Sequence, residues 1–372
     1  MIIVRYAEIG LKGKNRVFFE RMLVDNIQRK IKCTKVSRPR GRILVDTEVK
    51  NIKALDKIFG ISSYSVAKEI DWDIEVIKKE CFKVIKKMEF NSFKVNAQRL
   101  DKTYHIKSPD INKEVGAYIV EKMEKEVDLT NPDVEINIEI VNKKAYVYSD
   151  KIEGLKGLPV GVSGNVLSLL SGGIDSPVSS LLLMKRGCKV NFIHFHNYPY
   201  VKKQSLEKVK ELFNIVKEFE NKTKLFLVPF TDVQKEIVSK CSSKLRILLY
   251  RRVMLKIAEK VAHRNKCKAL ITGENLAQVS SQTLMNMSCV AKSTGLLMLR
   301  PLVGMDKSDI IELAQKYGTY EKSIEPHDDC CTFFVPKHPE TNAKMEDVLA
   351  DESKIDVDAM VEECLKNIEV FE

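Results

Sequence analysis

The pattern of apolar and polar positions divides the chain near residue 165. Before that point, short apolar runs alternate with amphipathic segments, which predicts α+β structure. After it, the strand-like runs are apolar throughout and are separated by helical segments, as in a parallel sheet covered on both faces. The sequence therefore predicts an α/β domain at the carboxyl end, preceded by smaller α+β units.

Two such units are expected before residue 165. The first has strands at MIIVRY (1–6) and RILVDT (42–47) and helices at 18–32 and 49–59. The second has strands at SYSVAKEI (63–70), SFKVNAQR (92–99), VEINIEIVN (134–142) and KAYVYSD (144–150), with helices at 74–88 and 111–124. We place the domain boundaries at residues 1–60, 61–165 and 166–372, with a Gly-rich linker at 154–164.

The last domain is expected to hold a mainly parallel, doubly wound sheet. Its strands are predicted at VLSLL (166–170), KVNFIHF (189–195), KLFLVPF (224–230) and KALITG (268–273). The first strand runs directly into SGGIDSP, a glycine loop that leads into a helix with Ser176 as N-cap, Pro177 as its first residue and Gly187 after its end. Backbone N–H groups of such a loop, together with the helix dipole, favour a phosphate ligand. The spacing is not that of a Walker loop.

Charge and composition limit the classes of molecule that this chain is expected to bind. The chain has 372 residues and a formal net charge of +11, and residues 1–60 carry 15 Lys and Arg against 6 Asp and Glu. A solvated basic face and a nucleic-acid surface explain this excess equally well. Because no long apolar run or signal peptide occurs, we expect a cytoplasmic protein without membrane contact. Nine cysteines without a Cys-x-x-Cys pair argue against a zinc ribbon and an iron–sulfur cluster.

Several motifs, taken together, resemble one known family. The string SGGIDS is similar to the signature of PP-loop ATP pyrophosphatases. The segments RYAEIGLKGKNRVFFE (5–20), TGENLAQVSSQT (272–283), LRPLVGMDKSDIIELAQKYGTYE (299–321) and DDCCTFFVPKHP (328–339) resemble the tRNA 4-thiouridine synthetase family. The resemblance covers nearly the whole chain. It implies a ferredoxin-like domain at 1–60, a THUMP RNA-binding domain at 61–165 and a PP-loop domain at 166–372.

The resemblance also implies an activity. Family members use ATP, with magnesium, to adenylate the uracil oxygen of uridine 8 in tRNA, and a persulfide sulfur then replaces that oxygen to give 4-thiouridine. Some also pass sulfur to the thiazole of thiamine. Some carry a rhodanese domain that bears the persulfide. This chain ends at Glu372 without one, so we expect a separate cysteine desulfurase to donate the sulfur.

Site residues follow from matching the motifs position by position. The catalytic residues implied are Asp175, Lys307, Cys331 and Cys330. The nucleotide-binding residues implied are Leu169, Leu170, Ser171, Gly172, Gly173, Asp175, Ser176, His194, Phe195, Arg251, Gly273 and Gln282. Lys307 follows Asp306, an expected N-cap, so its ammonium group is predicted at the start of a second helix. Apart from the motifs, the segment FKVNAQRLDKTYHIKS (93–108) places Lys94, Gln98, Arg99, Lys102 and Lys107 near one another, as in an RNA-contacting surface, although an exposed strand end would have the same pattern.

Some alternatives stay open. Local similarity favours Cys331 as the persulfide carrier, whereas a gap-free comparison from Lys307 favours Cys330. A PP-loop amidotransferase or NAD synthetase has the same loop but needs neither a basic amino-terminal half nor the Cys-Cys pair. A non-catalytic tRNA-binding protein would need neither Asp175 nor Lys307. The sequence leaves open the sulfur donor, the thiamine role and the oligomeric state, a homodimer included.

Overall fold

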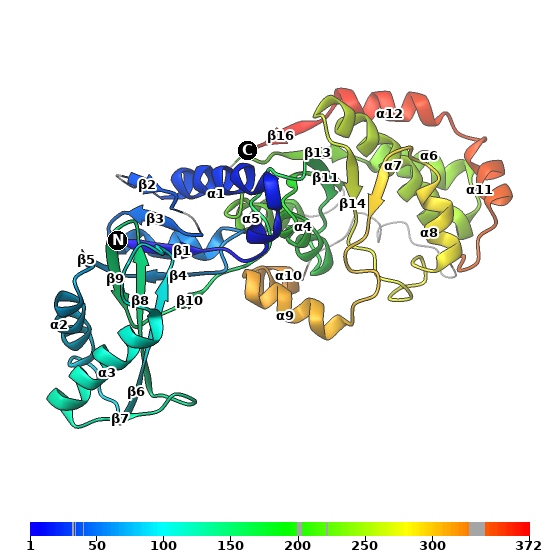
Figure 1. The fold of residues 1–372 in the computed structure, drawn as a ribbon. Coiled ribbons are helices and arrows are strands. Elements are labelled where there is room, and N and C mark those ends of the chain that lie inside the picture. Colours follow the sequence, from blue (N-terminus) through cyan, green and yellow to red (C-terminus); the bar gives the residue numbers. More distant parts are fainter. Residues whose placement is uncertain (32, 34, 40, 199–202, 221, 327–338) are drawn as a thin grey trace. The chain divides into compact units, whose positions relative to one another are not determined.

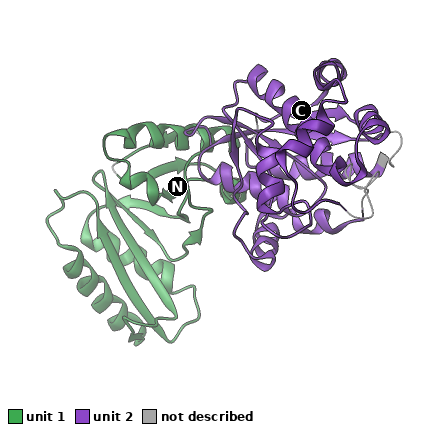
Figure 2. Ribbon diagram, turned by 90° about the vertical axis from the view of Figure 1, so that its right-hand side faces the viewer, with its two compact units in different colours: residues 1–159 green, residues 160–372 purple. Residues whose placement is uncertain are grey.

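The computed structural model describes residues 1–31, 33, 35–39, 41–198, 203–220, 222–326 and 339–372. The chain forms two compact units, Met1–Pro159 and Val160–Glu372 (Figures 1 and 2). Among the described residues, no helix is long and apolar enough to cross a membrane.

The first sheet of the amino-terminal unit is antiparallel, with strand order β10-β4-β1-β3-β2. Its strands are β1 (Ile2–Arg5), β2 (Lys35–Ser37), β3 (Ile43–Asp46), β4 (Ser63–Val66) and β10 (Ile152–Glu153). Its helices are α1 (Arg16–Lys30) and the 3₁₀ segments η1 (Glu8–Leu11), η2 (Gly13–Asn15) and η3 (Val49–Lys57). The apolar runs of β1 and β3 are buried, as their sequences predict.

The second sheet of this unit has the order β5-β9-β8-β6-β7. Its strands are β5 (Lys68–Asp71), β6 (Ser92–Arg99), β7 (Glu126–Val127), β8 (Val134–Val141) and β9 (Lys144–Tyr148), and its helices are α2 (Ile74–Ile85) and α3 (Ser108–Met123). In β6, the buried residues Phe93, Val95 and Ala97 alternate with less buried ones, whereas in β8 every residue from Ile136 to Val141 is buried. The single strand predicted at 63–70 is wrong, because β4 and β5 belong to different sheets.

A buried carboxylate connects the two sheets. Glu139 on β8 accepts hydrogen bonds from Arg5 on β1 and from Tyr148 on β9, each at 2.8 Å, and from Arg42. Burial would raise the pKa of the Glu139 carboxyl, but the charges of Arg5 and Arg42 outweigh it and hold that pKa below its usual value. The ionised carboxylate therefore ties β1 to β8 and β9.

We expect Glu139→Gln to lower the free energy of unfolding by about 3–5 kcal/mol, because it leaves the two arginines without an ionised partner. Urea unfolding would measure this, with the exposed Glu126→Gln as control, whose effect should stay within about 0.5 kcal/mol. Because the pKa of Glu139 is lower in the folded protein than in the unfolded chain, its ionised carboxylate stabilises the fold fully at any pH above the pKa of the unfolded chain. The advantage of the wild type should therefore shrink as the pH falls below about 4. Equal stability of the two variants at pH 7 would contradict this role.

The carboxyl-terminal unit is a six-stranded sheet with the order β15-β14-β11-β12-β13-β16. The strands are β11 (Asn165–Leu169), β12 (Lys189–His196), β13 (Leu225–Pro229), β14 (Ala269–Ile271), β15 (Leu297–Leu299) and β16 (Glu369–Phe371). All pairs are parallel except β13 with β16. The predicted fold class is confirmed, and the antiparallel edge strand β16 is an addition that the sequence did not predict.

Helices cover both faces of this sheet, so the strands between them are apolar on both sides. The helices are α4 (Asp175–Lys185), α5 (Lys203–Lys217), α6 (Thr231–Lys240), η4 (Ser243–Leu245), α7 (Arg246–Arg264), α8 (Leu284–Ala291), α9 (Lys307–Tyr317), α10 (Tyr320–Ile324), α11 (Met345–Glu352) and α12 (Val357–Lys366). Figure 1 shows α4 and α5 on one side of the sheet and α6, α7 and α8 on the other. The glycine loop lies at the carboxyl end of β11, where doubly wound folds bind ligands.

Candidate active site

Two serines close the glycine loop between β11 and α4. The Ser176 hydroxyl accepts a hydrogen bond from the Ser171 backbone N–H at 2.8 Å, and the two hydroxyl oxygens are 3.1 Å apart. The Gly173 N–H donates to Ser171 Oγ at 3.3 Å. The prediction of Ser176 as N-cap is wrong: Ile174 is the N-cap and Ser176 is the second helical residue. Its hydroxyl shapes the loop and does not cap the helix.

The catalytic candidates Asp175 and Lys307 lie together. Lys307 Nζ forms an ion pair with Asp175 Oδ1, and Gln278 Nε2 donates to Asp175 Oδ2 at 3.0 Å. Asp306 is the N-cap residue of α9, as predicted, although its side chain accepts no capping hydrogen bond. The glycine loop, the 272–283 segment and the start of α9 therefore meet at one carboxylate. Gln278 was not among the predicted residues, although it belongs to the quoted TGENLAQVSSQT motif.

Gly273 allows the 272–283 segment to approach the glycine loop closely. A Cβ atom at Gly273 would lie 2.8 Å from the Ser176 backbone nitrogen and 3.0 Å from Asp175 backbone carbon. The Ser179 hydroxyl also donates to the Thr272 carbonyl at 2.9 Å. The sequence predicted that Gly273 allows a close backbone approach. In the structure, the segment that it approaches is the glycine loop of the same chain.

We expect Gly273→Ala to destabilise the protein by about 1–3 kcal/mol, because backbone atoms of α4 cannot yield as a flexible side chain could. Gly304→Ala is the matched control, since a Cβ there meets no atom within 4 Å. Urea unfolding of both variants would measure the difference. If the two variants were equally stable, the contact between Gly273 and α4 would not constrain the loop.

A buried carboxylate, Glu274, follows Gly273 directly. It forms ion pairs with Arg251 on α7 and with Arg300, which follows β15, the latter at 2.5 Å. The Thr272 hydroxyl donates to it at 2.9 Å. Burial would raise the pKa of the Glu274 carboxyl, but the two guanidinium charges outweigh it and lower that pKa. Arg251 is thus held at the sheet edge, whereas Glu274 and Arg300 were not predicted as site residues.

The strand β12 contributes mainly backbone atoms to the carboxyl edge of the parallel sheet. His194 Nδ1 donates to the Leu170 carbonyl at 2.8 Å, and Leu170 itself is buried after the half-buried Leu169. The Phe195 ring lies in the core, edge-to-face with Phe230 at 5.3 Å between centroids. Any contact of Phe195 with a nucleotide would therefore come from its main chain.

Gln282 organises the loop in which it lies. Its side-chain oxygen accepts from the Asn275 N–H at 3.3 Å, and its carbonyl accepts from the Ala277 N–H at 2.9 Å. Ala277 has φ +63°, a conformation that non-glycine residues rarely adopt. The fold therefore holds this loop in a specific shape beside Asp175.

Comparisons with known proteins agree along the whole chain. The family model described as "Thiamine biosynthesis protein (ThiI)" matches residues 161–357, the ThiI ferredoxin-like domain matches 1–65 and the THUMP domain matches 65–150. The chain belongs to the ThiI family. A probable tRNA sulfurtransferase of Caldanaerobacter subterraneus subsp. tengcongensis is 44% identical over 369 residues, 97% of each chain. One of Moorella thermoacetica is 42% identical over 100% of this chain and 97% of its own.

Solved structures give the same result. The crystal structure of a 4-thiouridine synthetase–RNA complex with bound ATP matches with a TM-score of 0.92 and 37% identity, over 100% of this chain and 98% of that one. PH1313 from Pyrococcus horikoshii Ot3 matches with a TM-score of 0.67 and 26% identity, over 85% and 99%. The resemblance inferred from the motifs is confirmed, and so is the expectation that this ThiI family member is an enzyme.

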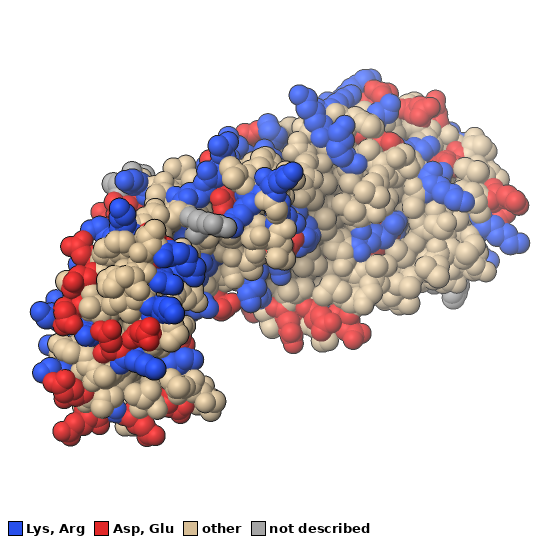
Figure 3. Space-filling view, in the orientation of Figure 1, with Lys and Arg blue, Asp and Glu red and all other residues tan. Residues whose placement is uncertain are grey.

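The five RNA-contacting candidates of this ThiI chain differ in their surroundings. Arg99 donates to the carbonyls of Tyr104 and Ile106 and so shapes the loop before α3, and the side chain of Gln98 accepts from Arg42 at 2.9 Å. Lys102 and Lys107 are exposed at either end of that loop, and Lys94 on β6 is half-buried. On the face drawn in Figure 3, Lys and Arg side chains interleave with Asp and Glu. Lys102 and Lys107 are therefore the exposed cations among the five candidates, and Gln98 is exposed as well.

The predicted sulfur carriers, Cys330 and Cys331, lie outside the described residues. Six other cysteines are expected to be inert packing residues; Cys33 is half-buried, and the other five are buried, namely Cys81, Cys188, Cys241, Cys267 and Cys289. Burial raises the pKa of the Cys364 thiol to about 11, which disfavours the reactive thiolate. Among the described residues, no group of three or more His, Cys, Asp or Glu side chains could hold a metal ion.

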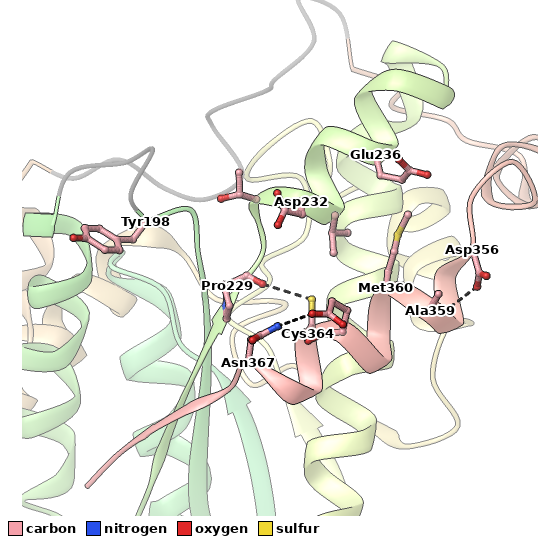
Figure 4. Close-up of a pocket in the computed structure, with 12 residues that line it drawn as sticks. Tyr198, Pro229, Asp232, Glu236, Asp356, Ala359, Met360, Cys364 and Asn367 are labelled. Atoms are coloured by element: carbon pink, nitrogen blue, oxygen red, sulfur yellow. Dashed lines mark hydrogen bonds between the residues drawn. The ribbon is translucent and has the colours of Figure 1, made fainter.

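A separate pocket of about 610 Å³ lies between the carboxyl end of β13, α6 and α12 (Figure 4). Cys364 lies on its wall, and its thiol donates to the Pro229 carbonyl at 3.5 Å. Its lining includes the acidic residues Asp232, Glu236, Asp356 and Glu363. Because these carboxylates would repel phosphate groups, this pocket does not fit a nucleoside triphosphate.

Proposed function

We propose that this chain is a tRNA sulfurtransferase that converts uridine 8 of tRNA to 4-thiouridine at the carboxyl edge of the parallel sheet. The observation that carries the proposal is the meeting of Asp175, Lys307 and Gln278 beside the glycine loop. Full-length similarity to proteins named tRNA sulfurtransferase supports the substrate. Sulfur donation to thiamine thiazole remains part of the proposal because of the description of the family model.

The first half-reaction is adenylation. The uracil C4 oxygen attacks the α-phosphorus of ATP, and pyrophosphate leaves. Backbone N–H groups at the start of α4 are suited to stabilise the phosphate charge, and the Lys307 ammonium adds to it. The Asp175 carboxylate has the hard oxygen donors that magnesium prefers, so Asp175 would hold the ion that accompanies ATP and neutralises phosphate charge.

The second half-reaction is sulfur transfer. A cysteine desulfurase places a persulfide on Cys331, and its terminal sulfur attacks C4 of the adenylated uracil while AMP leaves. The Cys330 thiol then attacks the Cys331 sulfur, which releases 4-thiouridine and leaves a Cys330–Cys331 disulfide for a reductant to reopen. The amino-terminal unit would hold the tRNA, and the reaction would take place in the cytoplasm.

ATP cleavage that depends on unmodified tRNA is the deciding test. We expect AMP and pyrophosphate to be released with an unmodified tRNA transcript, but not with a transcript that has cytidine at position 8. Nucleoside mass spectrometry should find 4-thiouridine once a desulfurase and cysteine are added. AMP release with ammonia or glutamine and no tRNA would favour an amidotransferase or NAD synthetase instead. No AMP under any condition would favour a non-catalytic tRNA-binding protein.

A further inference from the structure

Glu274 joins two arginines that come from distant parts of the chain. Arg251 on α7 pairs with Glu274 Oε1, and Arg300 after β15 pairs with Oε2. The Glu274 side chain is 3% exposed, and those of Arg251 and Arg300 are 19% and 18% exposed. Both carboxylate oxygens are thus occupied by guanidinium groups in a partly dry environment.

This cluster has an unbalanced charge. Two guanidinium groups against one carboxylate leave one net positive charge. A cavity of about 90 Å³ beside the cluster is lined, apart from Arg251, Thr272 and Glu274, by the apolar residues Leu169, Met254, Leu255, Val290 and Met298. A positive charge in apolar surroundings is costly unless an anion accompanies it. The cluster is therefore suited to bind an anionic group.

Each arginine also has a free donor. Arg251 Nη1 and Arg300 Nη2 are buried and have no hydrogen-bond partner among the residues that the structure describes. Buried donors are nearly always paired, so these two require acceptors that the described chain does not supply. Guanidinium N–H groups match phosphoryl oxygens in geometry as well as in charge.

The cluster borders the glycine loop. Leu169, the last residue of β11, lines the cavity and leads into that loop. Gly273, next to Glu274 in the chain, lies against the backbone of Ser176 at the start of α4. An anion bound by the arginines would therefore lie near the carboxyl end of β11, on the side where Gly273 meets the start of α4.

We propose that Glu274 is a positioning residue that holds Arg251 and Arg300 as a pair, so that their free N–H groups bind phosphoryl oxygens of the nucleotide. Arg300 becomes an additional nucleotide-binding residue, and Glu274 acts through the arginines without touching the ligand. The inference deepens the proposed adenylation and rests on it. A phosphate of the RNA backbone has the same chemistry, and the test separates the two sources.

The test measures ATP and tRNA binding separately, by calorimetry on the full chain, in Arg300→Met, Arg300→Lys and Glu274→Gln. For ATP we expect dissociation constants about 100-fold weaker for Arg300→Met and about 10-fold weaker for Arg300→Lys and Glu274→Gln, the range for charge-assisted hydrogen bonds. Binding of tRNA should change less than about threefold. Arg264→Met, an exposed arginine on the same helix as Arg251, is the control and should bind both ligands normally.

Stability does not decide the outcome. All titrations are made well below the melting temperature of each variant, and a purely structural role would lower that temperature without weakening ATP binding by the folded protein. If Glu274→Gln fails to fold, the two Arg300 variants decide. Normal ATP binding by folded Arg300→Met would overturn the proposal, and so would weaker tRNA binding with ATP binding unchanged. Because ATP binding is measured directly, a wild type that binds ATP without thiolating tRNA would refute the proposed function alone.

Discussion

Asp175→Asn is expected to reduce tRNA-dependent AMP release by at least about 100-fold while tRNA affinity stays within about threefold of the wild type. The substitution keeps the size of the side chain but removes the charge that pairs with Lys307. Without that negative charge, residue 175 can neither hold magnesium nor orient the ammonium group of Lys307, as proposed for Asp175. Quench-flow or steady-state assays of AMP, together with filter binding of tRNA, would measure the two effects.

Asp309→Asn is the matched control for this prediction. Asp309 is an exposed acid in the first turn of α9, close in sequence to Lys307. It should retain activity within about twofold, since exposed substitutions away from a site have small effects. Near wild-type turnover in Asp175→Asn would refute the assignment of the catalytic carboxylate.

The second large effect concerns the cysteine pair. Replacing both Cys330 and Cys331 with alanine is expected to abolish 4-thiouridine formation with a desulfurase and cysteine as donors, while slow tRNA-dependent AMP release persists. Adenylation needs no thiol, whereas sulfur transfer needs a persulfide carrier. AMP assays and nucleoside mass spectrometry on the same samples would separate the two half-reactions.

The single variants assign the two thiols. Cys331→Ala should form no 4-thiouridine, whereas Cys330→Ala should make about one product per enzyme and then stop unless dithiothreitol is present. Exchanged phenotypes would reverse the assignment within the pair. Cys33→Ala, a half-buried thiol of the amino-terminal unit, is the control and should remain fully active. Catalytic thiolation by the double variant would refute the relay.

The sequence alone predicted those features of the fold that depend on short stretches of the chain. The order of apolar strands after residue 165 predicted the parallel sheet, and the SGGIDS string predicted a strand, a loop and a helix that ends before Gly187, where φ is +88°. These features depend on residues a few positions apart, whose periodicity and turn preferences can be read directly. The motifs also identified the family, because they extend over most of the chain.

The tertiary structure decided what depends on residues far apart in the chain. Lys307 and Gln278 reach Asp175 across 132 and 103 residues, and Arg251 and Arg300 reach Glu274 from two different elements. The motifs predicted Asp175, Lys307 and Arg251 as site residues, but no local pattern shows which side chains each of them contacts. The N-cap prediction for Ser176 failed for a local reason: α4 begins one residue earlier, at Asp175, and the Ser176 hydroxyl accepts from the Ser171 N–H within the loop. A sequence shows which groups are present, but only the fold brings a carboxylate and its cations within hydrogen-bonding distance, and at Glu274 it also buries the carboxylate.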